Sequence, residues 1–153
     1  RLESSGFGNR VPLLAQLSTG SRPALINQFR RTSNGILLGT SSFWEGIDLP
    51  GDLLEILVIA KIPFDVPNEP TTEAYNEKIE ESGGNSFLEH SVPAAAIRLR
   101  QGFGRLIRSI NDEGIFINMD NRVVKKRYGH VFQSVIPVTM KTFSEESGLH
   151  VHA

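Results

Sequence analysis

Two arginines and a glycine share one short stretch of the sequence, QGFGRLIRS at residues 101–109. Gln101, Gly104, Arg105 and Arg108 are spaced i, i+3, i+4 and i+7, which predicts one face of a helix. A glycine inside a helix costs about 1 kcal/mol relative to alanine, so we expect a large group or a backbone to approach Gly104. Two guanidiniums beside that clearance would suit an anionic phosphate chain, because each presents a planar fork of permanent donors. From spacing alone, a solvated or salt-bridged pair of arginines explains the pattern equally well.

A second stretch with chemical potential is GTSSFWEGIDLPG, residues 39–51. Its hydroxyl side chains, which could bind phosphate oxygens without reading bases, are those of Thr40, Ser41 and Ser42. Asp48 follows the flexible Gly46 and could accept hydrogen bonds from a ribose hydroxyl or orient an arginine. Phe43 and Trp44 could stack on a base, but such large rings more often pack a loop onto the core, and we favour packing.

The surrounding sequence indicates alternating strands and helices that would position these two stretches. Predicted helices span about residues 22–31, 72–82, 91–110 and 122–132, and predicted strands span 36–38, 54–60 and 114–119. Within the long helix, Leu99, Phe103, Leu106 and Ile110 follow the spacing of a buried stripe. The strands read as apolar runs typical of a parallel sheet covered on both faces. This pattern predicts an α/β domain with a mainly parallel, doubly wound sheet, whose ligands bind beyond the carboxyl ends of the strands.

The amino-acid composition excludes several classes of protein and of metal site. With 153 residues, of which 39% are apolar, one compact domain is expected, and the absence of cysteine excludes disulfides, cysteine-ligated zinc and iron–sulfur clusters in this stretch. No apolar run approaches the roughly 20 residues of a membrane span, and no signal-peptide pattern opens the chain. The net charge is −1, but residues 65–90 carry a net −6 and residues 98–127 a net +5, so a polyanion should meet the second region.

The two ends of the chain look unlike a complete protein. The chain starts with Arg1, which suggests a piece of something longer, and we expect residues 148–153 to be a disordered tail. His150 and His152 have the spacing of a two-histidine metal site, but no third ligand is near, so we expect no metal there. Lys125, Lys126 and Arg127 form a basic cluster that suits either DNA or a solvated helix face.

Several long matches together point to a family. GTSSFWEGIDLPG and, further along, QGFGRLIRS resemble motifs V and VI of superfamily 2 helicases, and specifically the DinG/XPD-like DNA helicases. ILVIAKIPFDVPNEP lies between these motifs and GIFINMDNRVVKKRYGHVF follows them, so the resemblance covers roughly residues 20–137. It implies that residues 1–147 form most of a second RecA-like domain, truncated at its N-terminal edge, with helices on both faces of the sheet.

The resemblance also implies roles for individual residues. Arg108 is similar to the arginine finger that reaches the γ-phosphate of ATP, with Arg105 as its companion and Gln101 positioning both, beside Gly104. Residues similar to the nucleotide side of motif V are Glu45, Gly46 and Asp48. Residues similar to its single-stranded DNA contacts are Thr40, Ser41 and Ser42. The resemblance implies ATP and Mg²⁺ held mainly by the first RecA-like domain of the same parent chain, no metal bound here, translocation 5′ to 3′, and a cytoplasmic, nucleoid-associated bacterial protein.

The sequence lacks half of such an active site. No Gly-Lys dipeptide occurs, so a Walker A phosphate loop is absent, and Asp112-Glu113 precedes its predicted strand, which indicates a surface turn instead of a Walker B pair. We therefore expect the isolated chain to hydrolyse nothing. The alternatives are a noncatalytic α/β module that binds nucleic acid or a nucleotide, and an adaptor surface built on the acidic helix at residues 73–81.

Overall fold

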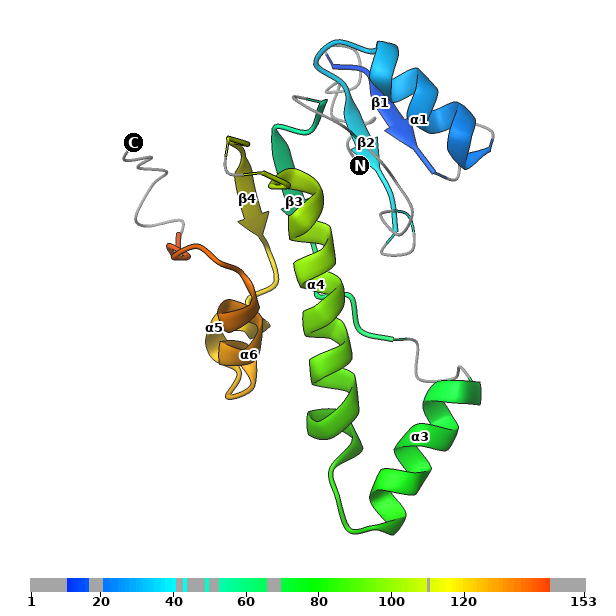
Figure 1. Ribbon diagram of the computed structural model, residues 1–153, viewed down its shortest axis with the longest axis vertical. Coiled ribbons are helices and arrows are strands. Elements are labelled where there is room, and N and C mark those ends of the chain that lie inside the picture. The colour runs from blue at the N-terminus through cyan, green and yellow to red at the C-terminus, as the bar shows by residue number, and fades with distance from the viewer. Residues whose placement is uncertain are drawn as a thin grey trace. The chain divides into compact units, whose positions relative to one another are not determined.

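The computed structural model describes residues 11–16, 21–40, 43, 49, 53–65, 70–109 and 111–143 (Figure 1). Its strands are β1 Leu13–Ala15, β2 Ile36–Leu38, β3 Ile56–Ile59 and β4 Ile115–Asn118. Its helices are α1 Arg22–Arg31, α3 Pro70–Glu81, α4 Val92–Leu106, α5 Arg122–Lys125 and α6 Gly129–Val135. The described residues fall into two compact units, one from residues up to 63 with 101–119, the other from 64–100 with 120 onward. The single domain predicted for residues 1–147 stays a prediction, and the tail at 148–153 lies outside the described residues.

Both strand pairs of the first unit are parallel, as the sequence predicts. β1 pairs with β2 from Leu13↔Ile36 to Ala15↔Leu38, and β3 pairs with β4 from Ile56↔Ile115 to Ile59↔Asn118. Among the described residues the two pairs are separate two-stranded sheets. The chain is therefore α/β with parallel pairing, whereas a single doubly wound, RecA-like sheet with helices on both faces stays a prediction.

A buried apolar cluster holds β1, α1 and the loop after β2 together. Its members are Leu14, Leu25, Phe29, Phe43 and Leu49. Phe43 is only 4% exposed, so the prediction that this ring packs on the core is confirmed. Gly39 makes this packing possible, because a Cβ on Gly39 would lie 2.8 Å from Cγ of Phe43. The loop that carries the second motif is thus anchored at its start.

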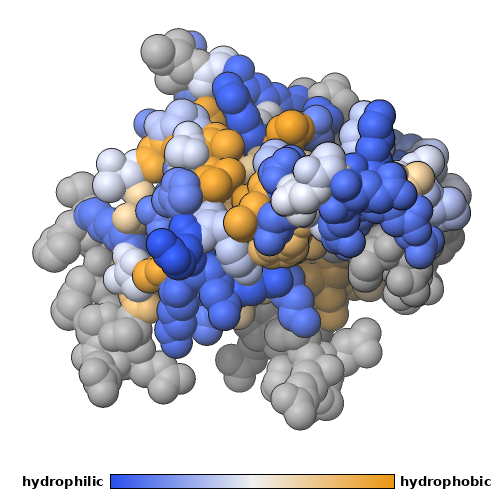
Figure 2. Space-filling view, turned by 90° about the horizontal axis from the view of Figure 1, so that it is seen from below, coloured by the Kyte–Doolittle hydropathy of each residue, from blue (hydrophilic) through white to orange (hydrophobic). Residues whose placement is uncertain are grey.

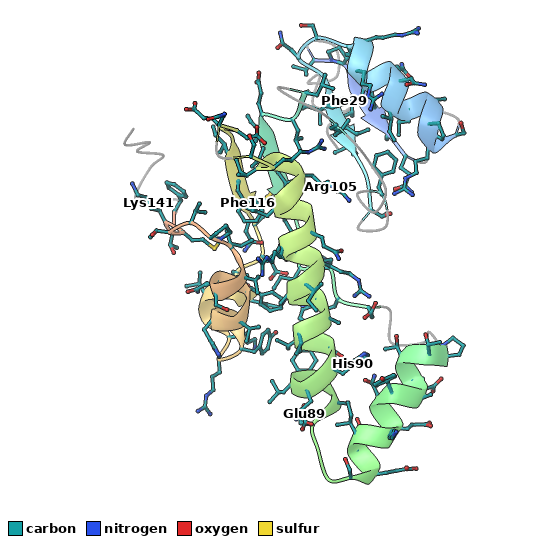
Figure 3. The ribbon with its side chains drawn as sticks, in the orientation of Figure 1. Phe29, Glu89, His90, Arg105, Phe116 and Lys141 are labelled. Carbon is teal, nitrogen blue, oxygen red and sulfur yellow. The ribbon has the colours of Figure 1, made fainter. Side chains whose placement is uncertain are left out.

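Helix α4 packs on one face of the β3–β4 pair. The rings of Phe103 and Phe116 meet edge to face with their centroids 5.4 Å apart (Figure 3). The opposite face is exposed: the fractions are 52% for Ile56, 49% for Val58, 55% for Ile115 and 43% for Ile117. Among the described residues, helical packing therefore reaches one face of this strand pair, and coverage of both faces stays a prediction. Figure 2 likewise shows apolar side chains at the surface among hydrophilic ones.

The acidic helix of the second unit is confirmed. α3 covers Pro70–Glu81, and the chain leaves it through Gly83, whose φ of 83° is a conformation that favours glycine. The N–H of Gly84 then returns to the carbonyl of Ile79 at 2.9 Å, closing the helix end. The glutamates of α3 are exposed, as expected for a solvated surface. A π-helical turn, Phe87–Ser91, leads into α4.

The single helix predicted for residues 122–132 is wrong, because the chain forms two short helices, α5 and α6. Lys126 adopts an extended backbone (ψ 146°) and ends α5. Gly129 then brings α6 so close that a Cβ at this position would lie 2.2 Å from the carbonyl oxygen of Val123. The side-chain amide of Gln133 donates to the same oxygen at 2.8 Å. A sequence pattern does not show this close approach.

A charged pair and a ring cluster complete the second unit. Arg122 donates to both carboxylate oxygens of Asp120, from Nε at 2.9 Å and 3.0 Å and from Nη2 at 2.6 Å. These bonds raise the pKa of the Arg122 guanidinium above its usual value. The guanidinium carbon also lies 5.0 Å from the ring centroid of Phe64, which stacks on Phe87 and meets Phe132 edge to face.

Candidate functional site

The last turns of α4 carry three of the predicted residues on one face. Gln101, Gly104 and Arg105 lie within this helix, so their i, i+3 and i+4 spacing is realised. Gln101 and Gly104 are exposed, and Arg105 is half-buried and is labelled in Figure 3. Among the described residues, no atom of a neighbouring element would lie within 4 Å of a Cβ at Gly104. The glycine therefore opens a clearance that no neighbouring side chain fills.

Arg105 contains an unsatisfied donor. Its Nε atom is buried, and it has no hydrogen-bond partner in the described part of the structure. Burying a polar group without a partner costs free energy, and each such group in a native protein calls for an explanation. An acceptor brought to this place, such as a phosphate or carboxylate oxygen, would remove that cost. The arrangement favours a ligand-facing arginine over a merely solvated one.

Arg108 does not lie on the predicted helical stripe. α4 ends at Leu106, so the expectation that the helix runs through Ile110 and aligns Arg108 with Gln101 is wrong; Ile110 itself lies outside the described residues. The cause is Asp112, whose Oδ2 accepts the backbone N–H of Arg108 at 2.7 Å and that of Ser109 at 2.9 Å. An N–H engaged in this way is diverted from the next i→i−4 bond of the helix. Arg108 instead stands at the start of a turn.

Asp112 is the functional candidate that the sequence did not reveal. It occupies the predicted surface turn, and its Oδ1 also accepts the Ser109 hydroxyl at 2.8 Å. The N–H of Arg108, the hydroxyl of Ser109 and the N–H of Ser109, in that order, hold the pKa of the Asp112 carboxyl below its ordinary value of 3.8. The only hint in the sequence is an aspartate three residues after a serine, a spacing common in turns that have no other role.

The structure ties the first residue of the second motif to the neighbouring strand end. Oε1 of Gln16 accepts both the backbone N–H of Thr40, at 2.9 Å, and its hydroxyl, at 3.0 Å. Gln16 directly follows β1 and Thr40 closely follows β2, so both lie at the carboxyl edge of this parallel pair, where a ligand is expected. No sequence signal indicated Gln16. Its role depends on a strand pairing between distant parts of the chain.

The other predicted ligand-binding residues of the second motif lie outside the described residues. They are Ser41, Ser42, Glu45, Gly46 and Asp48, and Trp44 also lies outside that part of the chain. In the second unit, Lys125 at the end of α5 and the following Lys126 and Arg127 are exposed. Among the residues that the structure describes, no cluster of three or more potential ligands could hold a metal ion. None of the described helices combines the length and the apolar character that crossing a membrane requires.

Parallel strand pairs packed with helices define this chain as an α/β domain. Comparison with known protein families identifies the family of this domain. Residues 1–139 match the family described as the helicase C-terminal domain, and the chain belongs to it. The resemblance to DinG-like helicases, stated from the two motifs, is confirmed.

The curated relatives are much longer proteins. The chain is 42% identical over 134 residues to the ATP-dependent DNA helicase YoaA of Haemophilus influenzae, covering 88% of this chain and 21% of that protein. It is 39% identical over 143 residues to the 3'-5' exonuclease DinG of Bacillus subtilis, covering 93% of this chain and 15% of that protein. It is also 51% identical over 102 residues to the ATP-dependent DNA helicase DinG of Photobacterium profundum, covering 67% and 15%. The chain therefore spans about a fifth or less of these relatives.

Proposed function

We propose that this chain is the second motor domain of an ATP-dependent DNA helicase of the DinG/YoaA type. In this proposal Arg108 is the arginine finger for the γ-phosphate, Arg105 is its companion and Gln101 helps to position them. The observation that carries the proposal is the buried, unpartnered Nε of Arg105 beside the open surface at Gly104. In the described part of the chain no acceptor meets this Nε atom, and a phosphate oxygen would supply one.

The chemistry assigned to the arginines is electrostatic. Phosphoryl transfer spreads negative charge over the transferred group, and a fixed guanidinium that meets this charge stabilises the transition state more than the ground state. ATP and Mg²⁺ would be held mainly by the other motor domain, Gly104 would give the nucleotide room, and Glu45, Gly46 and Asp48 would contribute to nucleotide binding. Closure of the two domains would bring the arginines to the nucleotide, and opening after hydrolysis would withdraw them.

The DNA track is assigned to the loop after β2. Thr40, Ser41 and Ser42 would contact the sugar–phosphate backbone of single-stranded DNA, which is bound largely without sequence preference. The hydrogen bonds of Thr40 to Gln16 support this assignment, because they fix the start of the loop at the carboxyl edge of the strands. A cytoplasmic location at the bacterial nucleoid belongs to the same proposal.

The decisive experiment measures the ATP hydrolysis of the full-length protein as a function of single-stranded DNA, for the wild type and Arg108→Ala. We expect kcat to fall on the order of 10³-fold or more, as for loss of an arginine finger, with single-strand binding preserved. Arg31→Ala is the matched control: Arg31 is an exposed arginine of α1, away from the predicted face, and its loss should leave turnover intact.

Two results would contradict the proposal. Wild-type turnover by Arg108→Ala would remove the finger from this residue. Robust ATP hydrolysis by the isolated 153-residue chain would show that the active site is not shared with another domain. A chain that bound DNA or nucleotide tightly by itself, in a parent whose turnover ignored Arg108, would instead be a noncatalytic binding module.

A further inference from the structure

We propose that Asp112 is a positioning residue for Arg108: its carboxylate fixes the backbone from which the finger projects. The inference rests on the proposed function of Arg108. It begins from the finding that Arg108 lies beyond the last residue of α4, Leu106. The backbone N–H of Arg108 donates instead to the carboxylate of Asp112, at 2.7 Å.

Three donors converge on this one carboxylate. The backbone N–H groups of Arg108 and Ser109 reach Oδ2 at 2.7 Å and 2.9 Å, and the Ser109 hydroxyl reaches Oδ1 at 2.8 Å. The turn is closed further by the N–H of Asp112, which donates to the Ser109 carbonyl at 3.2 Å. Hydrogen bonds to an ionised acceptor are shorter and roughly twice as strong as those between neutral groups. The backbone of Arg108 is thus held by the stronger class of hydrogen bond.

A negative charge is an unusual choice at this place. Asp112 binds the chain two residues beyond the carboxyl end of α4, where the helix dipole disfavours anions. Asparagine or serine could end a helix without that penalty. Local rules of this kind are broken most often where function requires a particular geometry. The charge of Arg108 adds the smallest of the contributions that lower the pKa of the Asp112 carboxyl.

The required geometry is that of the guanidinium fork. Catalytic groups must be held within about 0.5 Å of their productive position, and a misplacement of about 1 Å can lower the rate on the order of 10²-fold. Without Asp112, the Arg108 and Ser109 N–H groups lose a common acceptor and the turn is free to rearrange. The guanidinium of Arg108 would remain charged but would no longer be held in its productive position.

Asp112→Ala and Asp112→Asn in the full-length protein separate this role from a general loss of folding. Asp112→Ala should lower kcat for DNA-stimulated ATP hydrolysis on the order of 10²-fold, with the KM for ATP and single-strand binding close to wild type. Asparagine can accept both N–H groups through its amide oxygen and donate to Ser109, but without the charge that strengthens these bonds, so Asp112→Asn should recover part of kcat. Glu113→Ala, which removes the same charge from the neighbouring exposed residue, should behave as wild type.

A double-mutant test shows whether Asp112 acts through Arg108. In an Arg108→Ala background, Asp112→Ala should cause no further loss of kcat, because residues that act as a unit are not additive. Multiplied effects, or a wild-type kcat for Asp112→Ala, would overturn the inference. Full activity of Arg108→Ala alone would instead overturn the proposed function. If Asp112→Ala fails to fold, Ser109→Ala removes one of the three bonds; it should give a smaller kcat loss at unchanged KM, and an unchanged kcat would overturn the inference.

Discussion

Gly104 offers a test in which stability and activity should move in opposite directions. Gly104 lies inside α4, two residues before its last residue, Leu106. Among the described residues, a Cβ at Gly104 would meet no atom of a neighbouring element within 4 Å. Replacing glycine by alanine at an open helical position stabilises by roughly 0.5–1 kcal/mol. For a chain of this size that corresponds to a rise in Tm of roughly 2–4 °C per kcal/mol. Gly104→Ala should therefore raise the Tm of this 153-residue chain.

The same substitution should impair the full-length protein. If the clearance at Gly104 is kept for a nucleotide and the domain that carries it, an added methyl group projects into that contact and lowers DNA-stimulated ATP hydrolysis. Urea or thermal unfolding followed by circular dichroism measures the first effect, and steady-state ATP hydrolysis with saturating single-stranded DNA measures the second. Evolution would then have kept glycine at a cost in stability, the trade-off expected at a functional site.

Gly114→Ala is the matched control, because that glycine has no clearance. A Cβ at Gly114 would lie 2.5 Å from Cδ1 of Leu106 and 3.1 Å from the carbonyl oxygen of Glu55. Overpacking of this kind costs roughly 1–3 kcal/mol, so Gly114→Ala should lower the Tm. A lower Tm for Gly104→Ala would refute the open surface that the structure shows. A higher Tm of Gly104→Ala with undiminished ATP hydrolysis would refute the idea that activity requires the clearance at Gly104.

Two further predictions concern the charged pairs. Arg122→Ala should destabilise the chain by roughly 1.5–3 kcal/mol in urea unfolding, because it removes charged hydrogen bonds to the Asp120 carboxylate, whose side chain is only 6% exposed. Arg122→Lys keeps the charge but not the planar fork, so it should recover only part of the loss; full recovery by Arg122→Lys would contradict the role of the fork. The lowered pKa of Asp112 predicts a stabilising effect fully present above pH 3.8, the ordinary pKa, and lost as the pH falls through the lower folded value. Unfolding of wild type and Asp112→Asn should thus converge in acid, and a difference that persists at the lowest pH would contradict this.

The sequence predicts well those elements whose signals are local. Pro23 near the start of α1 and Gly83 after α3 mark helix ends with groups that act within one turn, and both helices fall where they are expected. The apolar stripe of α4 was equally readable: Leu99, Phe103 and Leu106 are all buried. The family was indicated by the two sequence motifs, because hydrophobic periodicity predicts helices and strands but does not identify a family.

The elements that were missed depend on contacts between distant or irregular parts of the chain. β1 is three residues long, and it exists as a strand because β2 pairs with it. The break between α5 and α6 depends on how closely Gly129 approaches Val123. The early end of α4 depends on a side chain, Asp112, that competes with the helical ladder. Hydrophobic periodicity contains none of these interactions.

The early end of α4 changes how the two arginines relate to each other. An i, i+3 spacing on a continuous helix would make Arg105 and Arg108 one rigid pair, but each is held by a different part of the structure. Arg105 belongs to the helix that packs through Phe103 on the β3–β4 pair, so a change in that core would move it directly. Arg108 belongs to a turn that is closed by Asp112, so its position can be disturbed without moving the helix. If both contact one nucleotide, a defect that misplaces the finger should leave the Arg105 contact in place, and ATP binding should then survive where hydrolysis does not.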